Sequence, residues 1–306
     1  MFSSIEKKRL IIFLGVAFGL SWLTALIIAF NGGLTNSPQV VEGTGLTLAT
    51  LLLASVYMWG PAFGHAAARL ATREGWQGAM LKPHFKTGWR YYLVAWLLPL
   101  LLVVAGAGVY FLFFPGHFDG SLELLRRSAA LQNVELGVSQ AWQYVAVQIG
   151  MALLLAPLLN AFSTFGEEFG WRAYLLPKLQ PFGAKKAALY SGLVWGVWHW
   201  PIIAMGYNYG FGYPAFPIAG MLAMALMTCA LGVVFAWLAL RSNSVWPAAL
   251  GHAMINGLGA LAYLMLKAEP VSLLGPSING LLGVIPLALI AAYIFTRKGW
   301  LEPAGQ

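Results

Sequence analysis

The chain has 306 residues, of which 59% are hydrophobic and only 9% are charged, and its formal net charge is +8. Soluble domains carry about 25% charged residues, so this composition excludes an ordinary soluble globular protein. The basic residues form no arm or stripe, which argues against a nucleic-acid-binding protein. The single cysteine, Cys229, excludes an internal disulfide.

Apolar runs of about 20 residues, the length that crosses a bilayer as a helix, recur along the chain between turns rich in glycine, proline and asparagine. We expect eight transmembrane helices. They cover about residues 9–30, 46–70, 91–115, 142–165, 187–206, 218–240, 247–266 and 281–296. The fourth is expected to continue as helix through the charged motif that follows it, and the last is the shortest. The predicted fold class is all-α, a polytopic membrane bundle of about eight helices.

Lysine and arginine are unevenly divided between the two sides of such a bundle. With the N-terminus in the cytoplasm, fifteen fall on the cytoplasmic side and three, Arg126, Arg127 and Lys267, fall outside, which accounts for the eighteen present. A cytoplasmic excess of lysine and arginine is the rule for membrane proteins. We therefore expect a multi-pass protein of the cytoplasmic membrane with both termini in the cytoplasm.

Polar side chains inside apolar segments are expensive and mark functional sites. Glu167 and Glu168 follow the fourth apolar segment, His199 lies in the fifth, and His252 and Asn256 lie in the seventh. At about 1.5 Å per residue along a helix, Glu167 and His199 lie at similar depth from the loop that joins their helices. Groups on these consecutive antiparallel helices can therefore meet.

Helical spacing assigns these side chains to faces. Glu168 and Arg172 are four residues apart, so they share a face and can pair. Glu167 is rotated by about 100° from its neighbour and points elsewhere, into the bundle. His252 and Asn256 are also four apart and project together.

A carboxylate and an imidazole that meet in a water-accessible cleft can activate a water molecule. A second histidine with an asparagine amide supplies donors for a developing oxyanion. Together these groups are equipped to hydrolyse an amide without a covalent intermediate. The G-x-S-x-G motif of serine hydrolases and the H-E-x-x-H motif of zinc proteases are both absent. His65, alone in an apolar segment, is interpreted as a packing residue that is hydrogen-bonded to a neighbour.

The order EExxxR, then an aromatic residue followed four positions later by histidine, then HxxxN, resembles the CPBP family. These are the CAAX-protease and bacteriocin-processing (Abi) intramembrane proteases, related to the CAAX prenyl endopeptidase. The resemblance covers about residues 140–265. The site residues that it implies are Glu167, Glu168, Arg172, His199, His252 and Asn256.

The resemblance also implies roles. Glu167 with His199 would activate water, Glu168 and its arginine partner would shape the site, and His252 with the asparagine would stabilise the oxyanion. The second motif of the family usually opens with phenylalanine, whereas here it opens with Trp195. We expect this aromatic exchange to affect substrate fit and not the chemistry.

Whether the mechanism uses a divalent metal such as zinc stays open, since the family is described both as metalloproteases and as metal-free glutamate proteases. Glu167, His199 and His252 are an acceptable zinc ligand set. We favour the metal-free mechanism slightly, because the candidates come from three separate helices with no i, i+4 histidine pair. His252 also has a better-motivated role beside Asn256.

The predicted function is that of an intramembrane endopeptidase, similar to CAAX prenyl proteases. Its partners would be the lipid bilayer and a membrane-associated peptide or protein, lipidated by analogy with the family, cleaved near the cytoplasmic face. A proton-coupled transporter is the first alternative, because buried glutamate and histidine also relay protons, but no repeated halves are found. A non-catalytic bacteriocin-immunity protein is the second, and the intact polar residues argue against it.

The domain organisation follows from these segments. Residues 1–306 are expected to form a single integral-membrane domain. Within it, 1–140 hold the N-terminal spans, 141–266 the catalytic core that resembles the family, and 267–306 the last span and the C-terminal tail. The segment 76–89 is interpreted either as an interfacial stretch along the membrane surface or as a plain loop.

Overall fold

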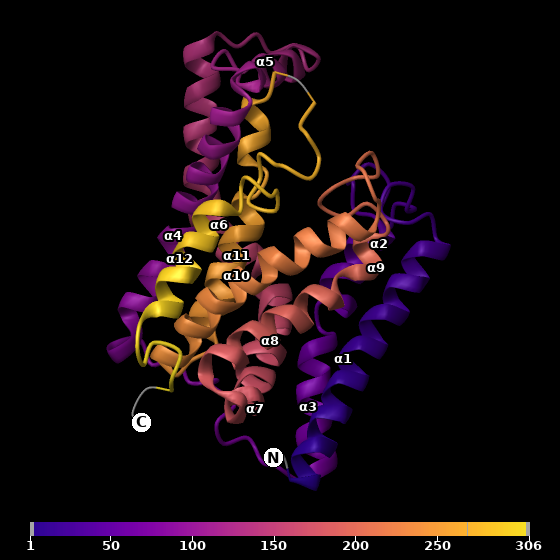
Figure 1. Cartoon of the computed structure of the whole chain (residues 1–306). Helices are drawn as coiled ribbons and strands as arrows, with labels where there is room; N and C mark the ends of the chain where they lie inside the picture. The colour runs from indigo at the N-terminus through magenta and orange to yellow at the C-terminus, as the bar shows by residue number, and fades with distance from the viewer. Residues whose placement is uncertain (1–2, 268, 304–306) are drawn as a thin grey trace.

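The computed structural model describes residues 3–267 and 269–303, and these residues form a helical bundle with two isolated β-bridges and no strand (Figure 1). The α-helices are α1 (Ser4–Phe30), α2 (Leu48–Leu52), α3 (Gly60–Thr72), α4 (Phe85–Phe113), α5 (Glu123–Ala130), α6 (Val138–Gly170), α7 (Leu176–Leu179), α8 (Ala184–Trp198), α9 (Trp200–Ile203), α10 (Ile218–Ser242), α11 (Trp246–Leu258) and α12 (Ile285–Thr296). Two π-helical turns are η1 (Leu53–Tyr57) and η3 (Trp171–Leu175). Three 3-10 turns are η2 (Pro115–His117), η4 (Gln180–Phe182) and η5 (Leu261–Met265).

Each of the eight expected apolar segments contains helix, which confirms the polytopic helical membrane bundle. Among the described residues, five helical stretches are long and apolar enough to cross a membrane. They are Ser4–Phe30, Phe85–Phe113, Val138–Phe182, Ile218–Ser242 and Trp246–Met265. The other three expected spans differ from the prediction. The segment 46–70 is broken, α8 has only 15 residues, and α12 has only 12.

The break in the second segment has a local cause. Pro61 has no N–H, so the carbonyl of Tyr57, four residues earlier, loses its helical donor. The hydroxyl of Ser21 on α1 donates to this carbonyl instead, at 2.8 Å. The break therefore ties η1 to α1, which also packs along α3.

The helices form a bundle in which segments far apart in sequence lie side by side. α8 packs along α10, α11 packs against both α6 and α4, and α12 packs against α10 and α4. Both termini and α7 lie at one end of the bundle, at the bottom of Figure 1, whereas α5 lies at the opposite end. We call these the terminal end and the distal end.

The fourth span continues as helix through the charged motif, as expected, and remains helical to Phe182. The continuation includes the π-helical turn η3, in which Leu176 donates to the carbonyl of Trp171, five residues earlier. Residues 74–84 take no regular structure before α4 begins. The segment 76–89 is thus irregular up to residue 84 and helical after it, and its position relative to the membrane surface stays a prediction.

Two glycines on α8 permit close approach to α10. A Cβ atom at Gly192 would lie 2.7 Å from the Cα of Cys229, and one at Gly196 would lie 2.6 Å from the Oγ1 of Thr228. Small residues spaced by one turn are the usual means by which membrane helices approach closely. This contact positions the end of α8, where His199 lies, beside α10.

Candidate active site

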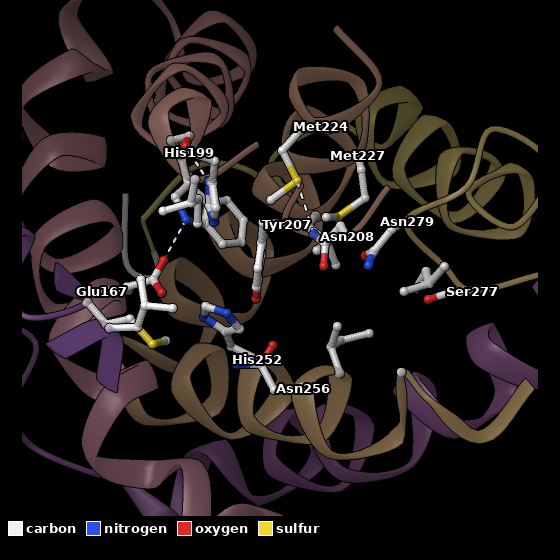
Figure 2. Close-up of a pocket in the computed structure, with 18 of the residues that line it drawn as sticks. Glu167, His199, Tyr207, Asn208, Met224, Met227, His252, Asn256, Ser277 and Asn279 are labelled. Carbon is white, nitrogen blue, oxygen red and sulfur yellow. Dashed lines mark hydrogen bonds between the residues drawn. The ribbon is translucent and has the colours of Figure 1, made fainter. Parts of the chain in front are cut away.

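A cavity of about 450 Å³ opens within the bundle and gathers polar side chains from three helices (Figure 2). Glu167 enters it from α6, His199 from the end of α8, and His252 and Asn256 from α11. The first three side chains are 2–6% exposed, whereas the asparagine is exposed. Glu168 and Arg172, by contrast, do not line the cavity.

The Glu167 carboxylate is held by the indole of Trp195, one turn before His199 on α8. The indole Nε1 donates to Oε2 of the carboxylate at 2.6 Å. A hydrogen bond of this kind fixes the orientation of the carboxyl group. A phenylalanine at position 195 has no such donor, so the tryptophan adds a hydrogen bond to the aromatic exchange that the sequence shows.

The His199 ring is oriented by its own helix. Its Nδ1 lies 2.8 Å from the carbonyl oxygen of Trp195. A carbonyl only accepts, so Nδ1 carries the hydrogen and the neutral ring has its lone pair on Nε2. The imidazole can therefore accept a hydrogen bond at Nε2.

The end of α8 is anchored by the N-terminal spans. Pro201 cannot donate to the preceding turn, and α8 ends just before it. The carbonyl of Trp198 accepts the Tyr57 hydroxyl at 2.6 Å and the Trp22 indole Nε1 at 3.1 Å. Two side chains from the N-terminal helical segments thereby hold the backbone next to His199.

Glu168 and Arg172 lie behind the cavity and are both fully buried. The Nε of the arginine lies 3.2 Å from Oε2 of the glutamate, which is the ion pair that their spacing predicts. The two groups are close but not aligned, so the guanidinium makes no hydrogen bond. Instead it lies over the rings of Trp195 and Phe235, with its Cζ 4.5 and 5.4 Å from their centroids.

The other oxygen of the same carboxylate holds His252. Oε1 of Glu168 lies 3.0 Å from Nδ1 of this ring. The rings of Trp195 and Phe235 flank the imidazole, with centroids 5.3 and 5.8 Å away. Nε2 of His252 is the ring nitrogen that is left for another partner. Asn256 lies one helical turn after His252 on α11.

Sequence reasoning did not identify several further polar side chains of the cavity. They are Asn160, Tyr207, Asn208, Ser277 and Asn279. Figure 2 shows Tyr207, Asn208 and Asn279 across the open space from the α11 side chains. Most of these residues lie in the irregular segments that follow α9 and α11, where no periodicity indicates which way a side chain points.

The residues suggested for a metal do not form a ligand group. Within residues 3–267 and 269–303, no three His, Cys, Asp or Glu side chains are grouped so that they could hold a metal ion. Nδ1 of His199 faces a carbonyl and Nδ1 of His252 faces a carboxylate, so Nε2 is the nitrogen that each ring has free.

The fold and the cavity together define a multi-pass membrane protein whose helical bundle encloses a cavity lined by both apolar and polar side chains. Residues 142–258 match the model of the family described as Type II CAAX prenyl endopeptidase Rce1-like. The six site residues all fall within this match. The matched segment is similar to this CAAX-protease family, in agreement with the resemblance that the three motifs carry.

A curated relative agrees with this assignment. Over 150 residues the chain is 27% identical to the CAAX prenyl protease 2 of Methanococcus maripaludis, which covers 48% of this chain and 52% of the relative. The chain thus spans about half the length of the curated relative that it matches. The first 140 residues, which supply Trp22 and Tyr57, lie outside the family match.

Proposed function

We propose that this protein is an endopeptidase of the CAAX-protease type that cleaves a membrane-associated polypeptide with a water molecule activated inside the membrane. The observation that carries the proposal is the cavity itself. A carboxylate, two imidazoles and an amide from α6, α8 and α11 line one space, with a buried ion pair behind them. The family match of the same segment supports a protease.

In the first step, Glu167 acts as the general base. It takes a proton from a water that also donates to Nε2 of His199, and the oxygen of that water adds to the scissile carbonyl carbon. The Trp195 indole holds the carboxylate in place for this transfer. When the carbon–nitrogen bond breaks, the same carboxyl group gives the proton to the leaving amine.

In the second role, His252 and Asn256 stabilise the negative charge that develops on the carbonyl oxygen. The asparagine amide donates directly. The imidazole donates from Nε2 when it carries both protons, and the Glu168 carboxylate at its Nδ1 stabilises the resulting positive charge. Donors aimed at a developing oxyanion lower the barrier by about 2.7–4 kcal/mol each.

The proposal includes the cytoplasmic membrane, with both termini in the cytoplasm, because the terminal end of the bundle carries most of the lysine and arginine. The orientation of the chain in the membrane then determines which compartment the cavity faces. Lipidation of the substrate is a family-level analogy and forms no part of the mechanism above.

Comparative peptidomics of membranes tests the proposal. Cells that make the wild-type protein are compared with cells that make Glu167→Gln, which keeps the size of the side chain and removes the base. Glu42→Gln, the same change on an exposed loop, is the matched control. We expect a membrane polypeptide to accumulate uncleaved with Glu167→Gln only. Identical peptide ends in all three strains would contradict an endopeptidase and favour a proton-coupled carrier.

A further inference from the structure

A second hollow of the molecule is a groove on the outside of the bundle, where α4, α6 and α11 meet. Its volume is about 440 Å³, close to that of the central cavity, and none of its lining residues also lines that cavity. The side chains of Leu93 and Leu154 in its walls are 43% and 65% exposed, so the groove opens away from the bundle. The residues that line it include Tyr92, Leu93, Trp96, Leu154, Pro157 and Leu250.

The walls of the groove belong to membrane-spanning segments. α4, α6 and α11 all lie in the helical stretches that are long and apolar enough to cross a bilayer. Lipid chains surround such helices, and a backbone group without a partner is costly among them. Whatever occupies the groove between these helices is therefore apolar over most of its length.

The polar groups of the groove are satisfied within the protein. Pro157 has no N–H, so the carbonyl of Leu153, four residues earlier, loses its helical donor. The indole Nε1 of Trp96 on α4 donates to this carbonyl at 2.8 Å. The hydroxyl of Tyr92 donates to the carbonyl of Pro83 at 2.5 Å. The surface that remains is apolar and suits a hydrocarbon chain.

One end of the groove carries a lysine on a fixed loop. The loop before α4 is tied to the groove at Pro83 by Tyr92, as described above, and at Leu81 by the start of α11. The indole Nε1 of Trp246, one helical turn before a groove residue of α11, donates to the carbonyl of Leu81 at 2.8 Å. Lys82 lies between the two anchored carbonyls and is exposed. The loop thus positions this lysine where α4 and α11 begin.

A second lysine lies on the same side of α4. Lys86 precedes the groove residue Leu93 by seven residues, which is two helical turns, so the two share a face of the helix about 10 Å apart along its axis. Its side chain is exposed as well. α4 runs from here toward the distal end, where α5 follows it (Figure 1). Both lysines therefore belong to the same end of the groove.

Exposed aromatic side chains surround this end. Phe85, Trp89 and Trp246 are 61%, 62% and 37% exposed. The rings of Phe85 and Tyr92 lie with their centroids 4.7 Å apart, which continues the aromatic surface into the groove. Aromatic residues gather at the level of the lipid head groups. The two lysines are thus expected at head-group level and the groove below them, among the acyl chains.

The charge of this end is not balanced within the protein. No aspartate or glutamate occurs between Glu74 and Asp119. None of the ion pairs formed by the described residues includes Lys82 or Lys86. Basic sites between membrane helices bind anionic lipid head groups, and each lysine near an anionic membrane surface contributes about 1 kcal/mol. An apolar groove with two unpaired lysines at one end matches a molecule with a negative head and an apolar chain.

We propose that this groove binds an anionic phospholipid, with one acyl chain between α4, α6 and α11 and the phosphate on Lys82 and Lys86. The site is independent of the proposed protease function, because it uses no residue of the central cavity. It is nevertheless close to the candidate active site in the chain, since Leu250 lies two residues before His252 on α11. A bound lipid packs against the outer side of a helix that carries part of that site.

Lipid titration followed by native mass spectrometry tests the head-group contacts. The full-length protein, purified in an uncharged detergent, is titrated with phosphatidylglycerol or with phosphatidylcholine of the same acyl chains. We expect the wild-type protein to bind the first phosphatidylglycerol more tightly than phosphatidylcholine. Lys82→Ala/Lys86→Ala is expected to bind phosphatidylglycerol about 30-fold more weakly, since each lysine contributes about 5-fold in affinity. Lys7→Ala/Lys8→Ala, a matched change of two exposed lysines on α1, is expected to leave the affinity unchanged.

A second pair of variants tests the groove. Leu154→Trp fills it from an exposed position and is expected to weaken binding of the first phosphatidylglycerol. Leu158→Trp, one helical turn further along α6, is 72% exposed and lies outside the groove, so it is expected to bind as the wild-type protein does.

Three results would overturn the proposal. Equal affinity of the wild-type protein for the two lipids shows that the groove is an ordinary part of the lipid boundary. Unchanged affinity in Lys82→Ala/Lys86→Ala removes the two lysines from the site. Unchanged affinity in Leu154→Trp shows that the bound lipid lies elsewhere on the bundle.

Discussion

Nδ1 of His252 lies 3.0 Å from Oε1 of Glu168, whose other oxygen lies 3.2 Å from Nε of Arg172. One buried carboxylate thus joins a histidine on α11 to an arginine on η3. The adjacent Glu167 turns to the cavity instead. The two neighbouring glutamates therefore have separate positions, one facing the cavity and one bracing its wall.

Breaking the buried pair is expected to destabilise the protein. Arg172→Met alone leaves the Glu168 carboxylate without its cationic partner, and removing one partner of a buried ion pair costs about 3–5 kcal/mol. The double variant Glu168→Leu/Arg172→Met removes both charges and is expected to regain much of the lost thermal stability while remaining inactive. Thermal unfolding in detergent micelles measures this. A double variant no more stable than Arg172→Met alone would count against a coupled pair.

Trp195→Phe restores the aromatic residue usual in the family and removes the donor to Glu167. Hydrogen bonds to charged groups contribute about 1.5–3 kcal/mol, so we expect kcat to fall by roughly tenfold or more with KM little changed. The control is Trp171→Phe, whose indole nitrogen makes no hydrogen bond and whose ring does not line the cavity. If Trp195→Phe cleaves as fast as the wild-type protein, the indole has no part in orienting the carboxylate.

His65 is predicted to brace the backbone beside the carboxylates. Its Nδ1 donates to the carbonyl of Phe169 at 2.8 Å, and Arg69 donates to its Nε2. His65→Phe leaves this buried carbonyl unpaired, which costs about 1–3 kcal/mol. His65→Asn retains a donor and is expected to lose less stability, by thermal unfolding in the same micelles. The reverse order of stability would show that volume, not the donor, is what matters at this position.

Chelators separate the two ways of activating water. With Glu167 as a free base, a strong zinc chelator is expected to leave the cleavage rate unchanged, since no three-ligand group exists in the described part of the chain. Elemental analysis of the purified protein accompanies the assay. One equivalent of metal, lost with the activity on chelation and restored with added zinc, would establish the metal-dependent mechanism in its place.

Helical periodicity in the sequence predicted contacts within one helix, but not contacts between helices or in irregular segments. The pairing of Glu168 with Arg172 and the hydrogen-bonded interior position of His65 follow from helical spacing and from the cost of polar groups in apolar segments, and both are confirmed. The contact between Glu168 and His252 joins two helices, and no spacing within either helix encodes it. Ser277 and Asn279 lie in an irregular turn, so their position in the cavity wall depends on how the whole bundle closes. Pro61 in the sequence indicates a break in the helix. The hydrogen bond from Ser21 to the carbonyl of Tyr57 joins two helices and could not be predicted from the sequence.

The proposed mechanism depends on Glu167 as the general base. The most direct measurement is turnover of the polypeptide identified by peptidomics, by purified protein in lipid bilayers, for wild type, Glu167→Gln and the surface control Glu42→Gln. We expect Glu167→Gln to stay folded and to slow cleavage by about 10²- to 10⁴-fold, whereas Glu42→Gln is expected to match the wild-type rate. Cleavage by folded Glu167→Gln at the wild-type rate would contradict this mechanism.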